Sequence, residues 1–165
     1  MIEIREERPG DVDAVRSVNR AAFEQDQEAD LVDALRDAGA ATLSLVAVVD
    51  SEVVGHLLYS PASIGTRSGA ALAPMAVLPH FQRQGIGTRL VETGNRMLKD
   101  SGCPFVIVVG HPRYYPRFGF VPARPLGITC TWEVPDDVFM ILVLDGAAMH
   151  GVSGLARYRD EFSNV

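Results

Sequence analysis

The sequence predicts an α/β (α+β) fold in which a mixed central sheet of about seven strands carries helices on both faces. Short apolar runs typical of strands alternate along the chain with segments whose apolar residues recur at helical spacing. One helical segment joins the buried runs at residues 72–77 and 105–109, and a strand–helix–strand unit of this kind makes its two strands parallel. The predicted order of elements is β-α-α-β-β-β-α-β-α-β-β.

In the first half of the chain, capping and turn residues divide the apolar pattern into elements. Asp11 is placed to cap the first helix, and Gly39 is placed to end the second. A hairpin turn is predicted at residues 50–52, a break at Pro61 and a loop over residues 65–69. The predicted elements are a strand over residues 2–7, one helix with Val15, Val18 and Ala22 on its apolar face, a second with Leu31, Leu35 and Ala38, and strands over residues 45–49, 53–64 and 72–77.

The second half continues the alternation of strands and helices. A long amphipathic helix runs from Gly85 to about Ser101 and is closed by Gly102. After the strand at 105–109 and an aromatic corner, two more strands are predicted near residues 127–134 and 139–144, with a turn at residues 135–137. We expect residues 1–145 to form one domain and the tail, residues 146–165, which lacks strong periodicity, to pack on it.

Composition limits the classes of protein to consider. At 165 residues, with 47% hydrophobic and 22% charged residues, one globular domain is expected. No apolar run approaches the ~20 residues that span a bilayer, and the charged start of the chain does not resemble a signal peptide. The formal charge is −6, and nothing basic clusters as nucleic-acid binding would require. We therefore expect a cytoplasmic protein with neither a membrane nor a nucleic-acid partner.

Cysteines and histidines give no sign of a disulfide framework or a metal. The two cysteines, Cys103 and Cys130, do not make a disulfide scaffold. We expect both to be free, buried thiols. The four histidines show no metal-ligand spacing, and local motifs of zinc enzymes and serine hydrolases are absent from the sequence. No metal is expected.

The strongest functional signal is the segment Gln82-Arg-Gln-Gly-Ile-Gly87, which lies between a predicted strand and the long helix. A glycine-containing turn that opens a helix exposes N–H groups without intrahelical partners at the positive end of the helix, which favours phosphate. A Walker loop is excluded because no Lys-Ser or Lys-Thr follows. A dinucleotide fingerprint is excluded because Leu90 stands where its third glycine should be. The alternative is a purely structural turn.

A second segment, Tyr115-x-x-Phe-Gly-Phe120, follows the buried strand at residues 105–109. The first motif has a fixed order: a strand, then Val77-x-Pro79, then Gln82-x-x-Gly85-x-Gly87, then an amphipathic helix. Together, the two segments resemble motifs of the GNAT superfamily of N-acetyltransferases. The resemblance covers about residues 2–145, although only the two motifs are specific. Residues 132–140 and the tail segment at 151–154 are similar to a bacterial subgroup of uncharacterised predicted acetyltransferases.

The resemblance implies acetyl transfer from acetyl-CoA, as a cosubstrate, to a primary amine that attacks the thioester directly. It implies that the pantetheine arm lies along residues 75–77, and that an N–H of this strand stabilises the oxyanion. It also implies that Tyr115 protonates the leaving thiolate, since a phenol with pKa near ~10 suits a thiol near ~8.5. The expected coenzyme-binding residues are Met75, Ala76, Val77, Gln82, Arg83, Gln84, Gly85, Ile86, Gly87 and Thr88.

The base that deprotonates the amine is not identified by the sequence. Residues 70–77 hold no carboxylate, although some members of the family carry a glutamate there. Candidates near the connection of the first two helices are Glu24, Asp26, Glu28 and Asp30, each of which is otherwise a solvated surface charge. His111 could assist the base or have a helix-capping or packing role, whereas His56 is interpreted as a satisfied core histidine. Arg113, Arg117 and Arg124 could contact the coenzyme phosphates or an acidic substrate, or they are plain surface charges.

The acceptor and the partners stay open at this stage. The fold that the resemblance implies would place the amine beside residues 23–28, Tyr115 and part of residues 132–137. A small-molecule amine or a peptide is expected as substrate, and the protein is expected to be a monomer or a homodimer. The alternative function is a non-catalytic acyl-CoA-binding sensor or regulatory module, for which the missing strand carboxylate is a mild argument.

Overall fold

A computed structural model describes residues 1–164, so that Val165, the end of the predicted tail, lies outside the described residues. The chain alternates strands with three α-helices and several short 3₁₀ helices. The helices are α1 (Val12–Phe23), α2 (Gln27–Asp37) and α3 (Ile86–Asp100), with 3₁₀ helices that include η3 (Tyr115–Phe118) and η5 (Asp160–Asn164). The strands are β1 (Ile2–Glu6), β2 (Leu43–Val49), β3 (Glu52–Ile64), β4 (Arg67–Val77), β5 (Phe105–Val109), β6 (Val121–Pro122), β7 (Ile128–Thr129), β8 (Phe139–Val143) and β9 (Gly154–Arg157).

The strands of residues 1–164 form one mixed sheet of nine strands. Its main order is β1-β2-β3-β4-β5-β8-β6, while β9 pairs with β3 and β7 pairs with β9. Within the main order, β4 and β5 are parallel and their neighbours are antiparallel. The predicted mixed sheet is confirmed, with β6 and β9 as strands that the sequence did not indicate.

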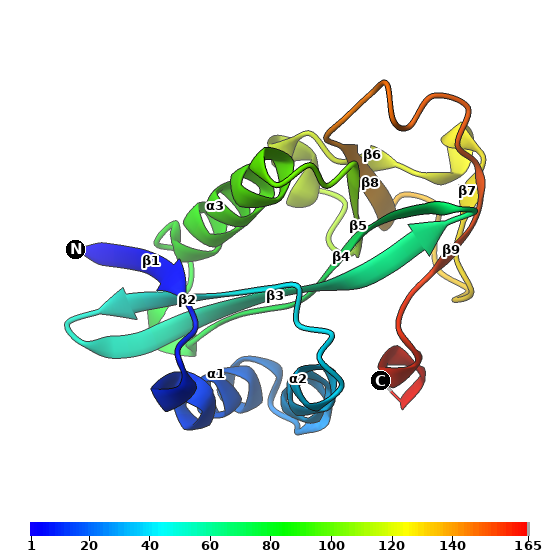
Figure 1. The fold of residues 1–165 in the computed structure, drawn as a ribbon. Helices are drawn as coiled ribbons and strands as arrows, with labels where there is room; N and C mark the ends of the chain where they lie inside the picture. The colour runs from blue at the N-terminus through cyan, green and yellow to red at the C-terminus, as the bar shows by residue number, and fades with distance from the viewer. Residues whose placement is uncertain (165) are drawn as a thin grey trace.

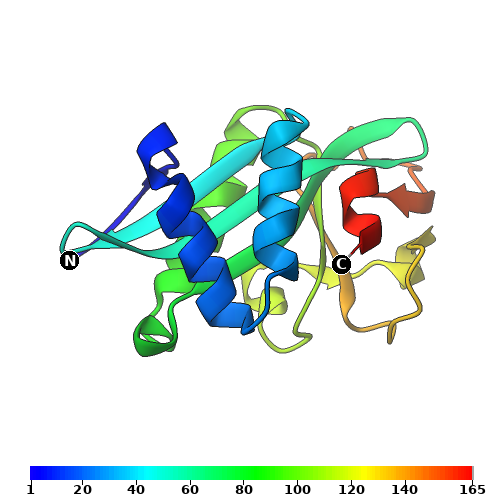
Figure 2. The same ribbon diagram turned by 90° about the horizontal axis from the view of Figure 1, so that it is seen from below.

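Helices cover both faces of the sheet, as predicted (Figure 1). The α3 helix lies on one face and buries Ile86, Leu90 and Val91 in the same cluster as the sheet residues Leu57 and Tyr59. The α1 and α2 helices lie side by side on the other face (Figure 2), where apolar residues of both helices pack against β2 and β3. Burial of these two apolar stripes against the sheet is the main source of stability in such a layered domain.

Close packing of α3 depends on a glycine at one position. A Cβ atom on Gly94 would lie 2.5 Å from the ring and the hydroxyl oxygen of Tyr59. With glycine there, the buried Tyr59 hydroxyl donates a hydrogen bond to Asn95 Oδ1 at 2.7 Å. The helix therefore approaches β3 closely without leaving this polar group unpaired.

Four details of the element prediction are wrong. Asp11 does not cap α1 through its side chain, because its carboxylate accepts from the Arg8 N–H at 2.7 Å and binds Arg5. Pro61 does not break β3. Along one edge, β3 pairs with β2 as far as Tyr59 and with β9 from Ser63, so this edge is unpaired at Pro61. The loop over residues 65–69 is a two-residue turn. The strand over residues 127–134 is reduced to β7 because residues 130–138 are irregular.

The tail contributes to the core despite its weak pattern. Ala156 of β9 pairs with Ile64 of β3, and both residues are buried. Phe162 of η5 is buried in the cluster of α2 residues that includes Leu31 and Leu35, and η5 lies beside α2 in Figure 2. Both cysteines are free and half-buried. No helix of residues 1–164 is long and apolar enough to cross a membrane.

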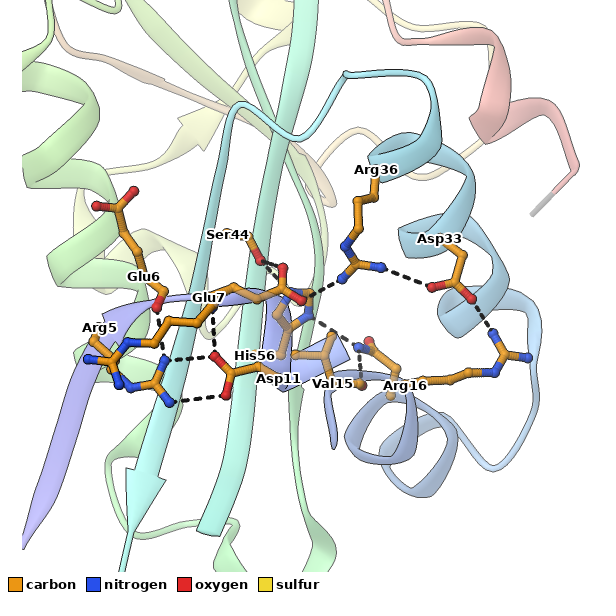
Figure 3. Close-up of polar contacts among 12 residues, drawn as sticks. Arg5, Glu6, Glu7, Asp11, Val15, Arg16, Asp33, Arg36, Ser44 and His56 are labelled. Atoms are coloured by element: carbon orange, nitrogen blue, oxygen red, sulfur yellow. Dashed lines mark hydrogen bonds and ion pairs between the residues drawn. The ribbon is translucent and has the colours of Figure 1, made fainter. Parts of the chain in front are cut away.

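A buried polar network crosses the layer between α1, α2 and the sheet (Figure 3). Arg36 binds Glu7, which accepts a hydrogen bond from the Ser44 hydroxyl at 2.7 Å. Since Ser44 donates its one proton there, it must accept from Nε2–H of His56, 2.9 Å away. Nδ1 of His56 then accepts from the Asn19 amide at 3.2 Å, so the imidazole is neutral. These two hydrogen bonds and full burial confirm the predicted satisfied core histidine. Burial, and after it the charge of Arg36, lower the pKa of His56 to about 3.

Candidate functional site

A large cavity opens between β4, β5 and the start of α3 and reaches α1, α2 and the tail. Its volume is about 1230 Å³, more than the ~300–1000 Å³ typical of a site for one small ligand. We call the part beside the start of α3, where the sequence predicts coenzyme binding, the coenzyme half, and the part beside α2 and the tail, where it predicts the amine, the acceptor half. This single space therefore has room for two molecules placed end to end.

The cavity exists because β4 and β5 separate. They pair only at Ala70 with Val106 and at Ala71 with Ile107. Beyond Ala71, β4 remains paired with β3 and contains one extra residue, since Leu57 pairs with Met75 and Tyr59 with Leu72. A bulge of this kind redirects a strand. The edge of β4 that faces away from β3 is therefore not paired with β5 over residues 72–77.

Two residues of the turn before α3 adopt left-handed backbone conformations. They are Arg83, with φ of 63°, and Gly85, with φ of 84°. The first hydrogen bond of the helix runs from the Arg89 N–H to the Gly85 carbonyl at 3.1 Å, so the N–H groups just before Arg89 have no intrahelical acceptor. A Cβ on Gly87 would lie 2.9 Å from the Tyr114 hydroxyl and 3.3 Å from the Met75 sulfur. The glycines thus keep this N–H cluster open to an anion.

Nine of the ten residues predicted to bind the coenzyme line the cavity: Met75, Ala76, Val77, Gln82, Arg83, Gly85, Ile86, Gly87 and Thr88. The tenth, Gln84, is exposed and does not line it, because its side chain turns back to donate to the His80 carbonyl at 3.1 Å. Ala76 and Ile86 are almost fully buried.

Tyr115 lies at the start of η3 and lines the cavity. Its ring packs edge to face against Tyr114 at 5.1 Å and Phe120 at 5.6 Å between ring centroids. Gly110 lets the ring sit there, since a Cβ on Gly110 would lie 2.4 Å from it. Burial, and after it the neighbouring Tyr114, raise the pKa of Tyr115. The phenol is therefore held in one orientation and in its protonated form.

Of the four carboxylates predicted near the acceptor, only Glu28 lines the cavity. Glu24 and Asp26 instead border a separate surface depression. Asp26 binds Arg20 at 2.8 Å and Asp30 binds Arg16 at 2.8 Å. The His56 imidazole is committed to its network, whereas His111 lines the cavity.

Charges in the cavity are divided between its two halves. The arginines that line it are Arg83, before α3, and Arg113 and Arg117, beside Tyr114, whose ring lies 4.6 Å from the Arg117 guanidinium carbon. Its carboxylates, Glu28 and Glu133, come from α2 and from the loop before β8. The coenzyme half therefore suits an anion, and the acceptor half suits a cation.

Several lining residues were missed by sequence reasoning. Tyr114, Tyr158, Phe162 and Leu31 all contribute to the wall, in addition to Trp132, Glu133 and Val134, which lie in the predicted segment. The tail residues gave no periodic signal, and they reach the site through pairing of β9 with β3 and packing of η5 on α2. Among residues 1–164 there is no group of three His, Cys, Asp or Glu side chains that could hold a metal ion.

Comparisons with known proteins identify the family. Residues 12–120 match the model of the acetyltransferase (GNAT) family. The chain is 35% identical to the uncharacterised N-acetyltransferase YhbS of Escherichia coli K12 over 97% of this chain and 98% of that protein. It is 38% identical to YjhQ of the same strain, also an uncharacterised N-acetyltransferase, over 77% of this chain and 74% of that one.

Two solved structures extend this likeness to the fold. The crystal structure of YhbS from E. coli in complex with CoA has a TM-score of 0.94 at 34% identity, over 98% of this chain and 92% of that one. A GNAT family acetyltransferase from Brucella melitensis in complex with acetyl-CoA has a TM-score of 0.81 at 34% identity, over 98% of each chain. This chain, with its divided sheet and its glycine turn before α3, belongs to the GNAT family of acetyltransferases.

Proposed function

We propose that the protein is an acetyl-CoA-dependent N-acetyltransferase that moves the acetyl group to a primary amine by direct attack on the thioester. The observation that carries this proposal is the continuous cavity that runs from the N–H cluster of α3 along the unpaired edge of β4. The relatives crystallised with CoA and with acetyl-CoA, both at 34% identity, support the choice of donor.

The coenzyme half would hold the phosphates. The N–H groups of residues 82–88 lie at the positive end of α3, which favours a pyrophosphate. Arg83, Arg113 and Arg117 line the same half and supply positive charge. The pantetheine arm would lie along residues 75–77, whose outer edge is left without a β5 partner, and an N–H there would donate to the thioester oxygen.

In the reaction, the neutral amine nitrogen would attack the carbonyl carbon, and the carbon–sulfur bond would break. The sulfur departs as a thiolate and takes a proton from the Tyr115 hydroxyl, while the amine nitrogen loses a proton to a carboxylate or water. The raised pKa of Tyr115 keeps the proton on the phenol until negative charge develops on the sulfur. The raised pKa also makes the Tyr115 phenol a weaker acid than an ordinary tyrosine. Hydrogen bonding to the departing sulfur is therefore a larger part of its role.

Two measurements test this function. Acetyl-CoA should raise the melting temperature, as any ligand selective for the native state does, and an amine panel should produce free thiol from acetyl-CoA. A melting curve that does not move at millimolar acetyl-CoA would refute donor binding. A shift without thiol release from any amine would favour the alternative, a non-catalytic acyl-CoA sensor.

A further inference from the structure

An aromatic wall closes the acceptor half of the cavity. We use this name for Trp132, Tyr158 and Phe162, which come from the loop before β8 and from the tail. The Trp132 and Tyr158 rings meet edge to face at 4.6 Å, and those of Tyr158 and Phe162 at 5.1 Å, between centroids. Rings locked edge to face in this way form a rigid, largely apolar surface.

The aromatic wall is continuous with other apolar side chains of the cavity. Trp132 and Tyr158 pack against the cluster that contains Leu31 of α2, and Ala73 of the β4 bulge packs against the same cluster. Phe23, at the end of α1, lines the cavity and is 36% exposed. The wall therefore lies next to the part of β4 where the thioester would be, and an apolar group there would be shielded from water on several sides.

One half-buried carboxylate lies within this apolar region. Glu28 lines the cavity from the first turn of α2, and both of its oxygens accept from the Gln25 amide, at 2.9 and 3.1 Å. The other lining carboxylate, Glu133, is exposed. In the part of the chain that the structure describes, the arginines that line the cavity lie in the coenzyme half, and no lysine lines it. The acceptor half thus offers one half-buried carboxylate, Glu28, beside a broad apolar surface, and an exposed one, Glu133.

We infer that the acceptor is an apolar primary amine of the arylalkylamine class, with its ammonium facing Glu28 and its ring against the aromatic wall. This inference rests on the proposed function. A polyamine or an aminoglycoside carries several charges or hydroxyl groups, and the few polar atoms of the aromatic wall, such as the unpaired Tyr158 hydroxyl, could not satisfy them all. A free amino acid carries a carboxylate, which has no cation to pair with in this half. The ammonium would give its proton to Glu28, directly or through one water, before the nitrogen attacks.

The single tryptophan of the chain makes the inference directly measurable. Because Trp132 is the only tryptophan, its fluorescence in the CoA-bound protein should change when an amine occupies the acceptor half. We expect 2-phenylethylamine to saturate this signal at a concentration at least about tenfold lower than ethylamine does, since burial of a ring is worth about 1.5–3 kcal/mol, roughly 10- to 150-fold. Equal or weaker binding of 2-phenylethylamine would overturn the inference.

Turnover with matched variants tests the same arrangement. Trp132→Leu should raise the KM for 2-phenylethylamine by about tenfold or more and leave that for ethylamine nearly unchanged. Glu28→Gln should lower kcat/KM for both amines at least about tenfold, and less at high pH where more of the amine is already neutral. Glu24→Gln, which removes a carboxylate outside the cavity, should change neither. The melting shift caused by acetyl-CoA controls for folding and donor binding in every variant.

The possible failures can be told apart. If the enzyme releases thiol fastest with spermidine, kanamycin or a peptide N-terminus, the proposed function stands and the arylalkylamine class is wrong. If acetyl-CoA binds but no amine causes release of free thiol, both the proposed function and the inferred acceptor class are wrong. If Glu28→Gln and Glu24→Gln lower kcat/KM equally, Glu28 has no special role in the acceptor site.

Discussion

Acid should destabilise this protein well before its carboxylates are protonated, because of His56. The imidazole is fully buried, accepts at Nδ1 from the Asn19 amide and donates at Nε2 to Ser44. A proton added to Nδ1 would face the Asn19 amide nitrogen, which is itself a donor, so this hydrogen bond would be lost. It would also place a charge in a buried site near Arg36. Both effects favour the neutral form in the folded state.

The sign and size of the effect follow from the two pKa values. The pKa of His56 is lowered from 6.5 to about 3, so the stabilisation is fully present above pH 6.5 and is lost as the pH falls toward 3. At pH 5 the unfolded chain binds the proton and the folded one does not, which costs about 2 kcal/mol relative to pH 7.5. For a chain of this size that is roughly 4–8 °C in Tm. Asp11, whose pKa is lowered from 3.8 by Arg5, acts only at lower pH.

Urea unfolding at pH 7.5, 6.5, 5.5 and 5.0 would measure this slope. His56→Gln can still donate to Ser44 and accept from Asn19, but it cannot titrate. It should be less stable at pH 7.5 and nearly independent of pH down to 5. His150→Gln, which changes an exposed histidine, should keep the wild-type slope. A His56→Gln protein with the full wild-type slope would refute the assignment.

Three further predictions concern the cavity. Gly87→Glu or Gly85→Asp should abolish the rise in melting temperature that acetyl-CoA causes, because each change adds bulk and negative charge at the N–H cluster. Thermal denaturation measures this, and a retained rise would contradict it. Tyr115→Phe should keep that shift and lower kcat by roughly 10²–10⁴-fold, the usual range for loss of a general acid; an unchanged kcat would leave the ring as packing only. Gly110→Ala should also lower kcat, since its Cβ would lie 2.4 Å from the Tyr115 ring, and a crystal structure of the variant would reveal whether the ring has moved.

Much of the fold was predictable because its elements carry their own local signals. The α3 helix begins and ends within one or two residues of its predicted bounds, since Gly85 and Gly102 both adopt positive φ at its two ends. The hairpin at Asp50 and Ser51, both with positive φ, joins β2 to β3 as predicted. Errors arose where tertiary context decides. Pro61 was expected to break β3, but one edge of the strand is unpaired at that residue, so the missing N–H costs little there.

The coenzyme half was predictable for the same reason. Its predicted residues come from one stretch, Met75 to Thr88, whose glycines and position before a helix have a direct physical meaning, whereas Arg113, Tyr114 and Arg117 come from a second segment. Gln84 is the exception, because the sequence could not tell that its side chain would turn back to the His80 carbonyl. Tyr115 was identified from its motif, and the structure adds that burial raises its pKa.

The acceptor half could not be assembled from local patterns, because its walls come from four segments that are distant in the sequence. Glu28 was one of four similar carboxylates, and only the structure shows that it lines the cavity, whereas Asp26 and Asp30 bind Arg20 and Arg16 outside it. Tyr158 and Phe162 lie in a tail without periodicity, and they reach Trp132 through pairing of β9 with β3 and packing of η5 on α2. If this half binds the acceptor as proposed, relatives that share the glycine turn can differ in acceptor. The tail and the loop before β8 are therefore the segments to exchange when substrate preference is compared between them.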